Sequence, residues 1–141
     1  MRLMIAAIAC AVIAVSAYPA AAAMGDVVVG GMLILRVRAE AGGMSIEQRA
    51  VLVEQRITNA LSRGRPTAET ITVRTVNAQP AIFVGDILII TVDANHARLN
   101  STTQQALAEI WLRNLREALP KAFPLLAPGV TRPVPSPTAS P

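Results

Sequence analysis

The residues whose types and spacing could support chemistry lie just after position 92. Asp93 and His96, the only histidine, are three residues apart, and Ser101 is the nearest serine that follows. An aspartate that orients a histidine, which in turn activates a serine, is the arrangement of a hydrolytic triad. The sequence contains neither a nucleophile elbow nor a glycine-rich oxyanion loop to complete it. We therefore expect Asp93 and Asn95 to form a turn, with His96 as an exposed loop residue.

The same segment lacks the ligands of a metal site. A calcium loop would need an oxygen ligand two positions after Asn95 and then glycine, where the chain has Ala97 and Arg98. Zinc would need three or four ligands, but the only cysteine, Cys10, lies near the N-terminus and there is no second histidine. The sequence therefore predicts no catalytic residue, no metal and no cofactor.

Three arginines are the candidates for a binding surface. Arg36 and Arg38 lie on the same face of a predicted strand, and Arg74 lies on a second predicted strand. If these strands are neighbours and the helices cover the opposite face, the guanidiniums form a basic, uncovered surface for an anion or a partner. The alternative is an ordinary solvated face of the sheet.

Alternating apolar residues predict the strands that would position these groups. The first strand spans 32–38, and a β-branched segment at 70–76 predicts the second. Residues 81–84 and 87–92 form a hairpin around Gly85-Asp86. The last strand is apolar on both faces, which favours a central position in the sheet. In the first strand, the residues assigned to the buried face are Leu33, Leu35 and Val37.

Helical periodicity predicts two helices. The first spans 45–62 and begins with a capping box in which Ser45 is the N-cap. The second runs from about Ser101 to Pro120, where the proline ends it. The buried stripe of the first helix consists of Ile46, Ala50, Val53, Ile57 and Leu61. The buried stripe of the second consists of Leu107, Ile110, Trp111, Leu115 and Ala118. The solvent face of the first helix is assigned to Arg49, Arg56 and Arg63.

The order strand, helix, three strands, helix predicts an α+β domain. Its simplest form is a four-stranded, antiparallel-rich sheet with two helices on one face. We assign the domain to residues 32–120 and a flexible joint to residues 24–31, which contain Gly30-Gly31. Residues 121–141 are rich in proline and are predicted to form a disordered tail.

Residues 1–23 have the composition of a signal peptide. Arg2 precedes an apolar run from Ile5 to Val15, and small residues lead up to Ala23. We therefore expect a periplasmic or secreted protein whose mature chain starts near Ala23, with an uncleaved inner-membrane anchor as the alternative. The formal charge of +4 falls to +3 when Arg2 is removed, and aromatic residues make up only 3% of the chain. This mild charge does not indicate a nucleic-acid-binding protein.

Three segments together resemble a known domain. They are GMSIEQRAVLVEQRI at 43–57, IFVGDILIITVDANHA at 82–97 and STTQQALAEIWLRNLREAL at 101–119. Across about residues 32–119 the chain is similar to the extracytoplasmic N-terminal domain of bacterial mechanosensitive-channel-like proteins, and to small exported proteins with that domain alone. The resemblance implies a structural module without catalytic residues. A proline-rich segment follows Leu119 in place of pore helices, so we expect any link to a channel to be indirect.

These observations predict an exported, non-enzymatic interaction or structural module of the cell envelope. Its partner would be an envelope protein or an anionic membrane surface. The first alternative is a periplasmic small-ligand binding protein, which an apolar pocket with a few convergent polar groups would favour. The second is a small hydrolase using His96, which an Asp93–His96 pair beside a serine in a cleft would favour.

Overall fold

A computed structural model of the chain describes residues 23–126. In chain order the elements are β1 (Asp26–Val29), β2 (Met32–Arg36), α1 (Ile46–Ser62), the 3₁₀ turn η1 (Ala68–Thr70), β3 (Ile71–Val76), β4 (Gln79–Val84), β5 (Ile87–Thr91), α2 (Ala94–Leu99) and α3 (Gln104–Leu126). β1 and β2 form an antiparallel hairpin, and β3, β4 and β5 form a separate antiparallel sheet in that order. The predicted α+β class is confirmed.

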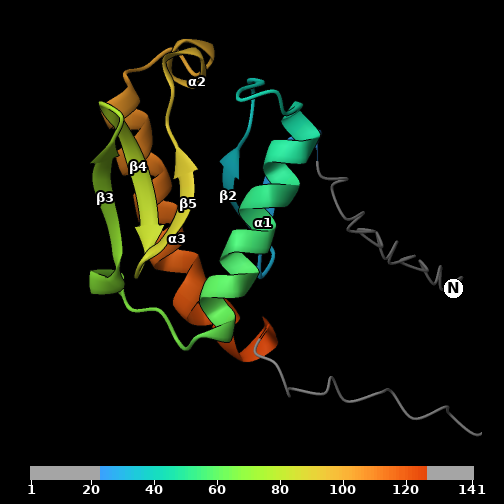
Figure 1. Cartoon of the computed structure of the whole chain (residues 1–141). Helices are drawn as coiled ribbons and strands as arrows, with labels where there is room; N and C mark the ends of the chain where they lie inside the picture. Colours follow the sequence, from blue (N-terminus) through green and yellow to red (C-terminus); the bar gives the residue numbers. More distant parts are fainter. Residues whose placement is uncertain (1–22, 127–141) are drawn as a thin grey trace, which may run out of the picture.

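The two long helices hold the two sheets together. α3 packs against β2, β3 and β4, and in Figure 1 it lies behind the three-stranded sheet. α1 packs against β1 and β5, so it spans both sheets. The core between these elements is mostly aliphatic, in keeping with the low aromatic content, and its fully buried side chains include Ile34, Ile57, Ile71, Ile89, Leu115 and Leu119.

The prediction of one four-stranded sheet is wrong. Residues 26–29 form β1, and Gly30-Gly31, both with positive φ, turn the chain into β2. Residues 24–31 are therefore part of the domain rather than a flexible joint. Glycine is also favoured here by space, because a Cβ on Gly30 would lie 3.3 Å from the Cβ of Ala122 on α3, closer than an ordinary contact. A four-residue strand next to a glycine pair has too little alternation to be recognised from sequence.

Each sheet contains a β-bulge with a buried isoleucine. The register skips Ile34 between β1 and β2, and it skips Ile89 between β4 and β5. A bulge leaves the extra residue outside the ladder, so its buried carbonyl needs another donor. Asn114 on α3 donates to the Ile34 carbonyl at 2.9 Å, and Arg56 on α1 donates to the Ile89 carbonyl at 3.1 Å. Both bulges are thus completed by side chains from the helices.

Two predictions about the strands are wrong, and the bulge in the first sheet explains one of them. Ile34 and Leu35 are both buried while Leu33 is 47% exposed, because the bulge breaks the alternation that assigned Leu33 to the core. β5 is an edge of the three-stranded sheet and β4 is its centre. β5 is nevertheless apolar on both faces because α1 covers it.

The N-terminus of the first helix and most of its buried residues agree with the prediction. Ser45 caps α1 in a capping box with Gln48, and Ala50, Val53, Ile57 and Leu61 are buried. The solvent face assigned to the arginines is wrong for two of them: Arg49 is buried, with 8% of its surface exposed, and Arg56 is half-buried, whereas Arg63 is exposed as predicted. Since α1 lies between two sheets, its arginine face is covered by β5 instead of by water.

The C-terminal helical region differs from its prediction in three ways. The expected turn after position 93 is a short helix, α2, and α3 begins at Gln104 rather than Ser101, whose φ of 52° is not helical. Ile110 is 40% exposed, although the rest of the predicted stripe is buried. α3 continues past Pro120 to Leu126 because Ala122 and its neighbours still pack against the core, which offsets the hydrogen bond that proline cannot donate.

The helix therefore includes six residues, 121–126, that were assigned to the tail. The predicted signal peptide and the rest of the predicted tail lie outside the described residues. Within residues 23–126, no helix is both long and apolar enough to cross a membrane.

Candidate functional site

Asp93 is the centre of a hydrogen-bonded network in the core. Its carboxylate accepts from the backbone N–H of His96 at 2.9 Å, which caps α2, and from Nδ1 of the same histidine at 2.8 Å. The guanidinium of Arg49 lies 3.2 Å from the same carboxylate and also donates to the Ala39 carbonyl. The predicted Asp93–His96 pair is therefore present, and Arg49 is a partner that the sequence analysis missed.

His96 is a core residue rather than an exposed loop residue. None of its surface is exposed, and its ring meets Trp111 edge-on, with centroids 5.5 Å apart and planes at 81°. Its Nε2 is buried and has no hydrogen-bond partner within the described structure. Ser101 is exposed and makes no hydrogen bond to His96 there. This enclosure favours a structural role, since a general base must reach a substrate proton.

The network shifts two pKa values downward. Burial lowers the pKa of His96, and this outweighs the opposing effect of the Asp93 carboxylate. Burial alone would raise the pKa of Asp93, but the hydrogen bonds from His96, together with the Arg49 charge, hold it below its ordinary value. The native network at neutral pH thus consists of a neutral histidine that donates from Nδ1, an ionised aspartate and a charged arginine.

This arrangement predicts a loss of stability as the pH falls below about 6.5, the ordinary pKa of histidine. Below about pH 6.5, the histidine of the unfolded chain binds a proton, whereas native His96, with its lowered pKa, stays neutral. The free energy of unfolding therefore falls with decreasing pH, with a slope of at most about 1.4 kcal/mol per pH unit. Asp93 adds nothing to this slope, because its contribution to the free energy of unfolding is lost only when the pH falls below 3.8, the ordinary pKa of aspartate. Urea unfolding monitored between pH 5 and 7.5, roughly, would measure the slope.

A matched variant isolates the histidine. His96→Asn keeps a donor for Asp93 but does not titrate, and the chain contains no other histidine. We expect the variant to be less stable than wild type at neutral pH, yet nearly independent of pH over this range. Identical slopes for the two proteins would contradict the assignment of the slope to His96.

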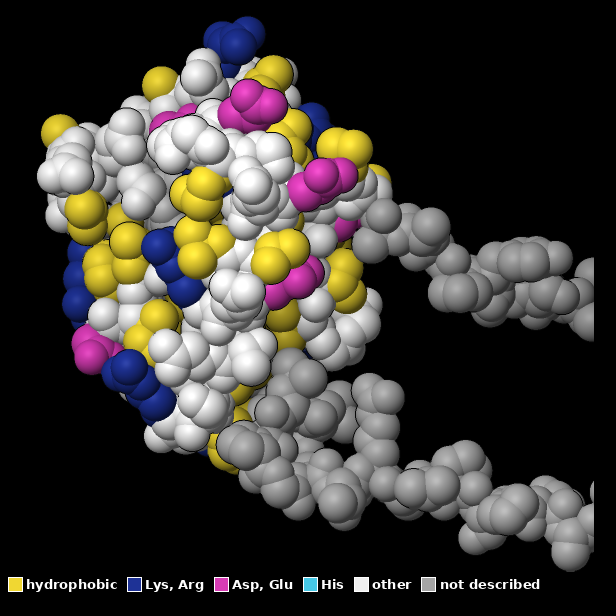
Figure 2. Space-filling model, turned by 45° about the vertical axis from the view of Figure 1, so that its right-hand side comes forward, with side chains coloured by type: hydrophobic (Ala, Val, Ile, Leu, Met, Phe, Trp, Pro, Cys, Tyr) yellow, Lys and Arg dark blue, Asp and Glu magenta, His cyan; other side chains and the backbone are white. Residues whose placement is uncertain are grey.

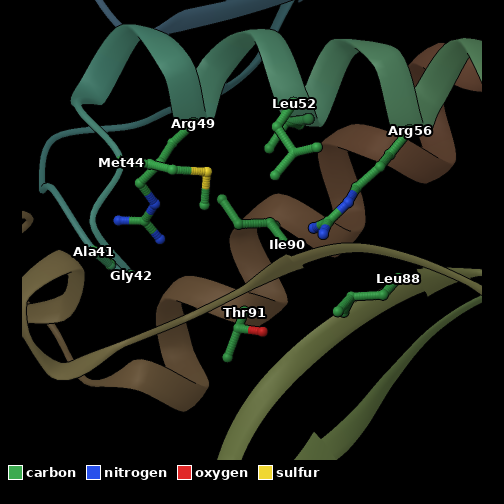
Figure 3. Close-up of a pocket in the computed structure, with 10 residues that line it drawn as sticks. Ala41, Gly42, Met44, Arg49, Leu52, Arg56, Leu88, Ile90 and Thr91 are labelled. Carbon is green, nitrogen blue, oxygen red and sulfur yellow. The ribbon is translucent and has the colours of Figure 1, made fainter.

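Next to this network, a cleft of about 220 Å³ separates α1 from β5. Figure 3 shows side chains that descend from α1 toward the strand, with two guanidiniums flanking an apolar middle section. Arg49 forms one end and Arg56 the other. The apolar walls consist of Met44, Leu52, Val53, Leu88 and Ile90. The cleft thus combines apolar walls with two cationic groups.

The two arginines differ in how they are compensated. Arg49 has Asp93 as a charge partner, whereas Arg56 donates to the Ile89 carbonyl and forms no ion pair with any described residue. Burial lowers the pKa of Arg56, although the group remains charged at neutral pH. The positive charge of Arg56 is therefore half-buried without a compensating negative charge among the described residues.

The arginines of the predicted docking surface are used within the chain. Arg36 pairs with Asp26, and Arg38 donates to the Leu99 carbonyl at 3.2 Å. Arg74 donates to the Gly85 carbonyl at 2.8 Å and stacks over Phe83 at 4.6 Å. β2 pairs with β1 and β3 pairs with β4, so strand pairing does not bring the three arginines together. A docking role for Arg36, Arg38 and Arg74 stays a prediction.

Two further features concern possible ligands. Within residues 23–126, no three side chains of the metal-binding types cluster closely enough to hold an ion. On the face shown in Figure 2, hydrophobic side chains are dispersed among polar ones, with Lys and Arg side chains between them. The cleft between α1 and β5 remains the candidate binding site.

A family model described as a domain of unknown function, DUF8459, matches residues 26–122. The chain belongs to this family. The family match begins at the first residue of β1 and ends within α3, which agrees with a domain that includes β1, the strand within residues 24–31 that were predicted to be a joint. No curated protein and no solved structure matches the chain. The resemblance to the domain of mechanosensitive-channel-like proteins remains a prediction, since the family description does not mention channels.

Proposed function

We propose that this chain is an exported, non-enzymatic binding module of the bacterial cell envelope, and that the cleft between α1 and β5 is its binding site. The cleft is the observation that supports this most directly, because apolar walls with a few convergent polar groups are typical of small-ligand sites. Export is inferred from the composition of residues 1–23. The proposal therefore favours a small ligand over a docked protein or a membrane surface.

The buried network supports the non-enzymatic part of the proposal. The only histidine is enclosed by Trp111 and bonded to Asp93, so it serves the packing of α2 against α3. The cleft itself is lined by guanidinium, thioether, hydroxyl and aliphatic groups. Guanidiniums bind anions firmly but are poor proton carriers, because they do not deprotonate in proteins.

The proposal predicts that a cleft-filling substitution abolishes ligand-induced stabilisation. Thr91 lies at the end of β5 and lines the cleft, so Thr91→Tyr should occupy the space. A ligand that binds only the native state raises the melting temperature. We expect a low-molecular-mass fraction of envelope extract to raise the melting temperature of the wild-type chain but not that of Thr91→Tyr.

Thr75→Tyr is the matched control, since Thr75 is an exposed residue of β3 and does not line the cleft. It should respond to the extract as wild type does. An equal response of all three proteins would place the binding elsewhere, and no response in any fraction would remove the support for a small-ligand module.

A further inference from the structure

We infer that the cleft takes a short aliphatic monocarboxylate, with Arg56 binding the carboxylate group. This inference rests on the proposed function and specifies the chemistry of its ligand. It follows from the charge of the cleft, the free donors of Arg56, and the size and lining of the space beside them.

The charge of the site calls for one negative group. Arg49 and Arg56 contribute two positive charges, and Asp93, 3.2 Å from Arg49, contributes one negative charge. Arg56 has no carboxylate within ion-pair distance among the described residues. A single anion beside Arg56 would neutralise the site, and in a partly desolvated cleft that attraction is stronger than at an open surface.

The hydrogen-bonding groups of Arg56 favour a carboxylate. A guanidinium has five N–H donors, and one of those of Arg56 is used by the Ile89 carbonyl. Its planar fork matches the two oxygens of a carboxylate in a bidentate arrangement. A second carboxylate at the other end would have to compete with Asp93 for Arg49. A monocarboxylate therefore fits better than a dicarboxylate.

The remaining space favours a short aliphatic chain. In Figure 3 the side chains of Leu52 and Ile90 lie between the two guanidiniums, with Leu88 near Arg56. The cleft volume of about 220 Å³ is below the range of about 300–1,000 Å³ that holds drug-sized ligands, so the space suits a smaller molecule. Butyrate and valerate are of this size, and their methylene groups would pack on the apolar walls. Phosphate would leave those walls unfilled.

Nuclear magnetic resonance titration of the purified chain with butyrate tests the inference, with succinate and inorganic phosphate as competitors in separate titrations. We expect saturable shifts in Arg56, Leu52 and Ile90, and tighter binding of butyrate than of either competitor. Arg56→Met should weaken butyrate binding by about tenfold or more, as loss of a charge-assisted bidentate contact requires. Arg63→Met is the control, because Arg63 is the C-cap of the same helix but pairs with exposed Asp86 outside the cleft.

A second variant covers the case in which Arg56→Met does not fold. Arg56→Lys keeps the charge and a donor for the Ile89 carbonyl but lacks the fork, so we expect it to weaken butyrate binding by about threefold or more. The inference is overturned if butyrate causes no saturable shift, if both Arg56 variants bind it as wild type does, or if succinate or phosphate binds more tightly.

Failure of this inference and failure of the proposed function give different results. Stabilisation by envelope extract that Thr91→Tyr abolishes, together with no butyrate binding, would leave the binding module in place and reject the monocarboxylate. Butyrate binding at Arg56 without any response to envelope extract would keep the carboxylate site and reject the part of the proposed function that supplies its ligand from the cell envelope.

Discussion

Replacing Asp93 by alanine is expected to lower the free energy of unfolding by about 3–5 kcal/mol, the range for breaking a buried ion pair by removing one partner. The substitution removes the N-cap of α2, the acceptor for His96 Nδ1 and the charge partner of Arg49 together. Arg49, of which only 8% is exposed, would then keep a single backbone carbonyl as a partner. The cost arises mainly from this uncompensated cation in the core.

Two further variants make this expectation specific. Asp93→Asn keeps an oxygen for the N-cap but removes the charge, so its stability should fall between those of wild type and Asp93→Ala. Asp86→Ala removes the partner of Arg63 in a pair whose aspartate side chain is 83% exposed, and it should cost less than about 1 kcal/mol. Urea denaturation of the four proteins gives the comparison. If Asp93→Ala and Asp86→Ala cost the same small amount, Arg49 reaches water and the network is not buried.

Replacing Trp111 by alanine is expected to cost about 3–5 kcal/mol, as for other large core side chains, which would threaten the folding of a domain of this size. Trp111 is 4% exposed and lies on α3 where that helix meets α2. Its removal would leave a cavity and would also deprive the buried His96 ring of its edge-on neighbour. Thermal and urea unfolding followed by circular dichroism would measure the loss.

The neighbouring residue is the control for Trp111. Ile110 precedes it on α3 but is 40% exposed, so Ile110→Ala should cost less than about 1 kcal/mol. Because Trp111 is the only tryptophan, the native protein should emit at short wavelength and shift to the red on unfolding. A water-like emission maximum in the native protein would show that Trp111 is exposed and that the core of α3 is misplaced.

Much of the local structure could be predicted because it depends on neighbouring residues. The capping box at Ser45 involves groups only three residues apart, and the turn at Gly85 needs a positive φ that glycine adopts easily. The apolar stripe of α1 and the burial of Trp111 follow from helical spacing. Pro120 was expected to end α3, but the helix continues past it. The following turn packs against the core, and local helix propensity does not include such tertiary contacts.

The Asp93–His96 pair was predicted, but its environment was not. Residues three apart at the start of a short helix come together through local geometry. Burial depends instead on Trp111 and Arg49, which come from two other helices. Aspartate is mostly exposed in proteins and histidine is intermediate in burial, so the residue types alone favoured a surface loop.

By itself, then, the sequence determined that Arg49 and Arg56 share one face of a helix, because a spacing of seven residues is two turns. The tertiary structure decided what that face meets. α1 is covered by the β1–β2 hairpin on one side and by β5 on another, so the arginines lie against a strand instead of in water. Arg49 pairs with the carboxylate of Asp93, which follows β5, whereas Arg56 donates to the carbonyl of the bulged residue Ile89. The positions of bulges and the neighbours of a helix depend on contacts between distant segments of the chain. Local sequence patterns do not include such contacts and so could not predict them.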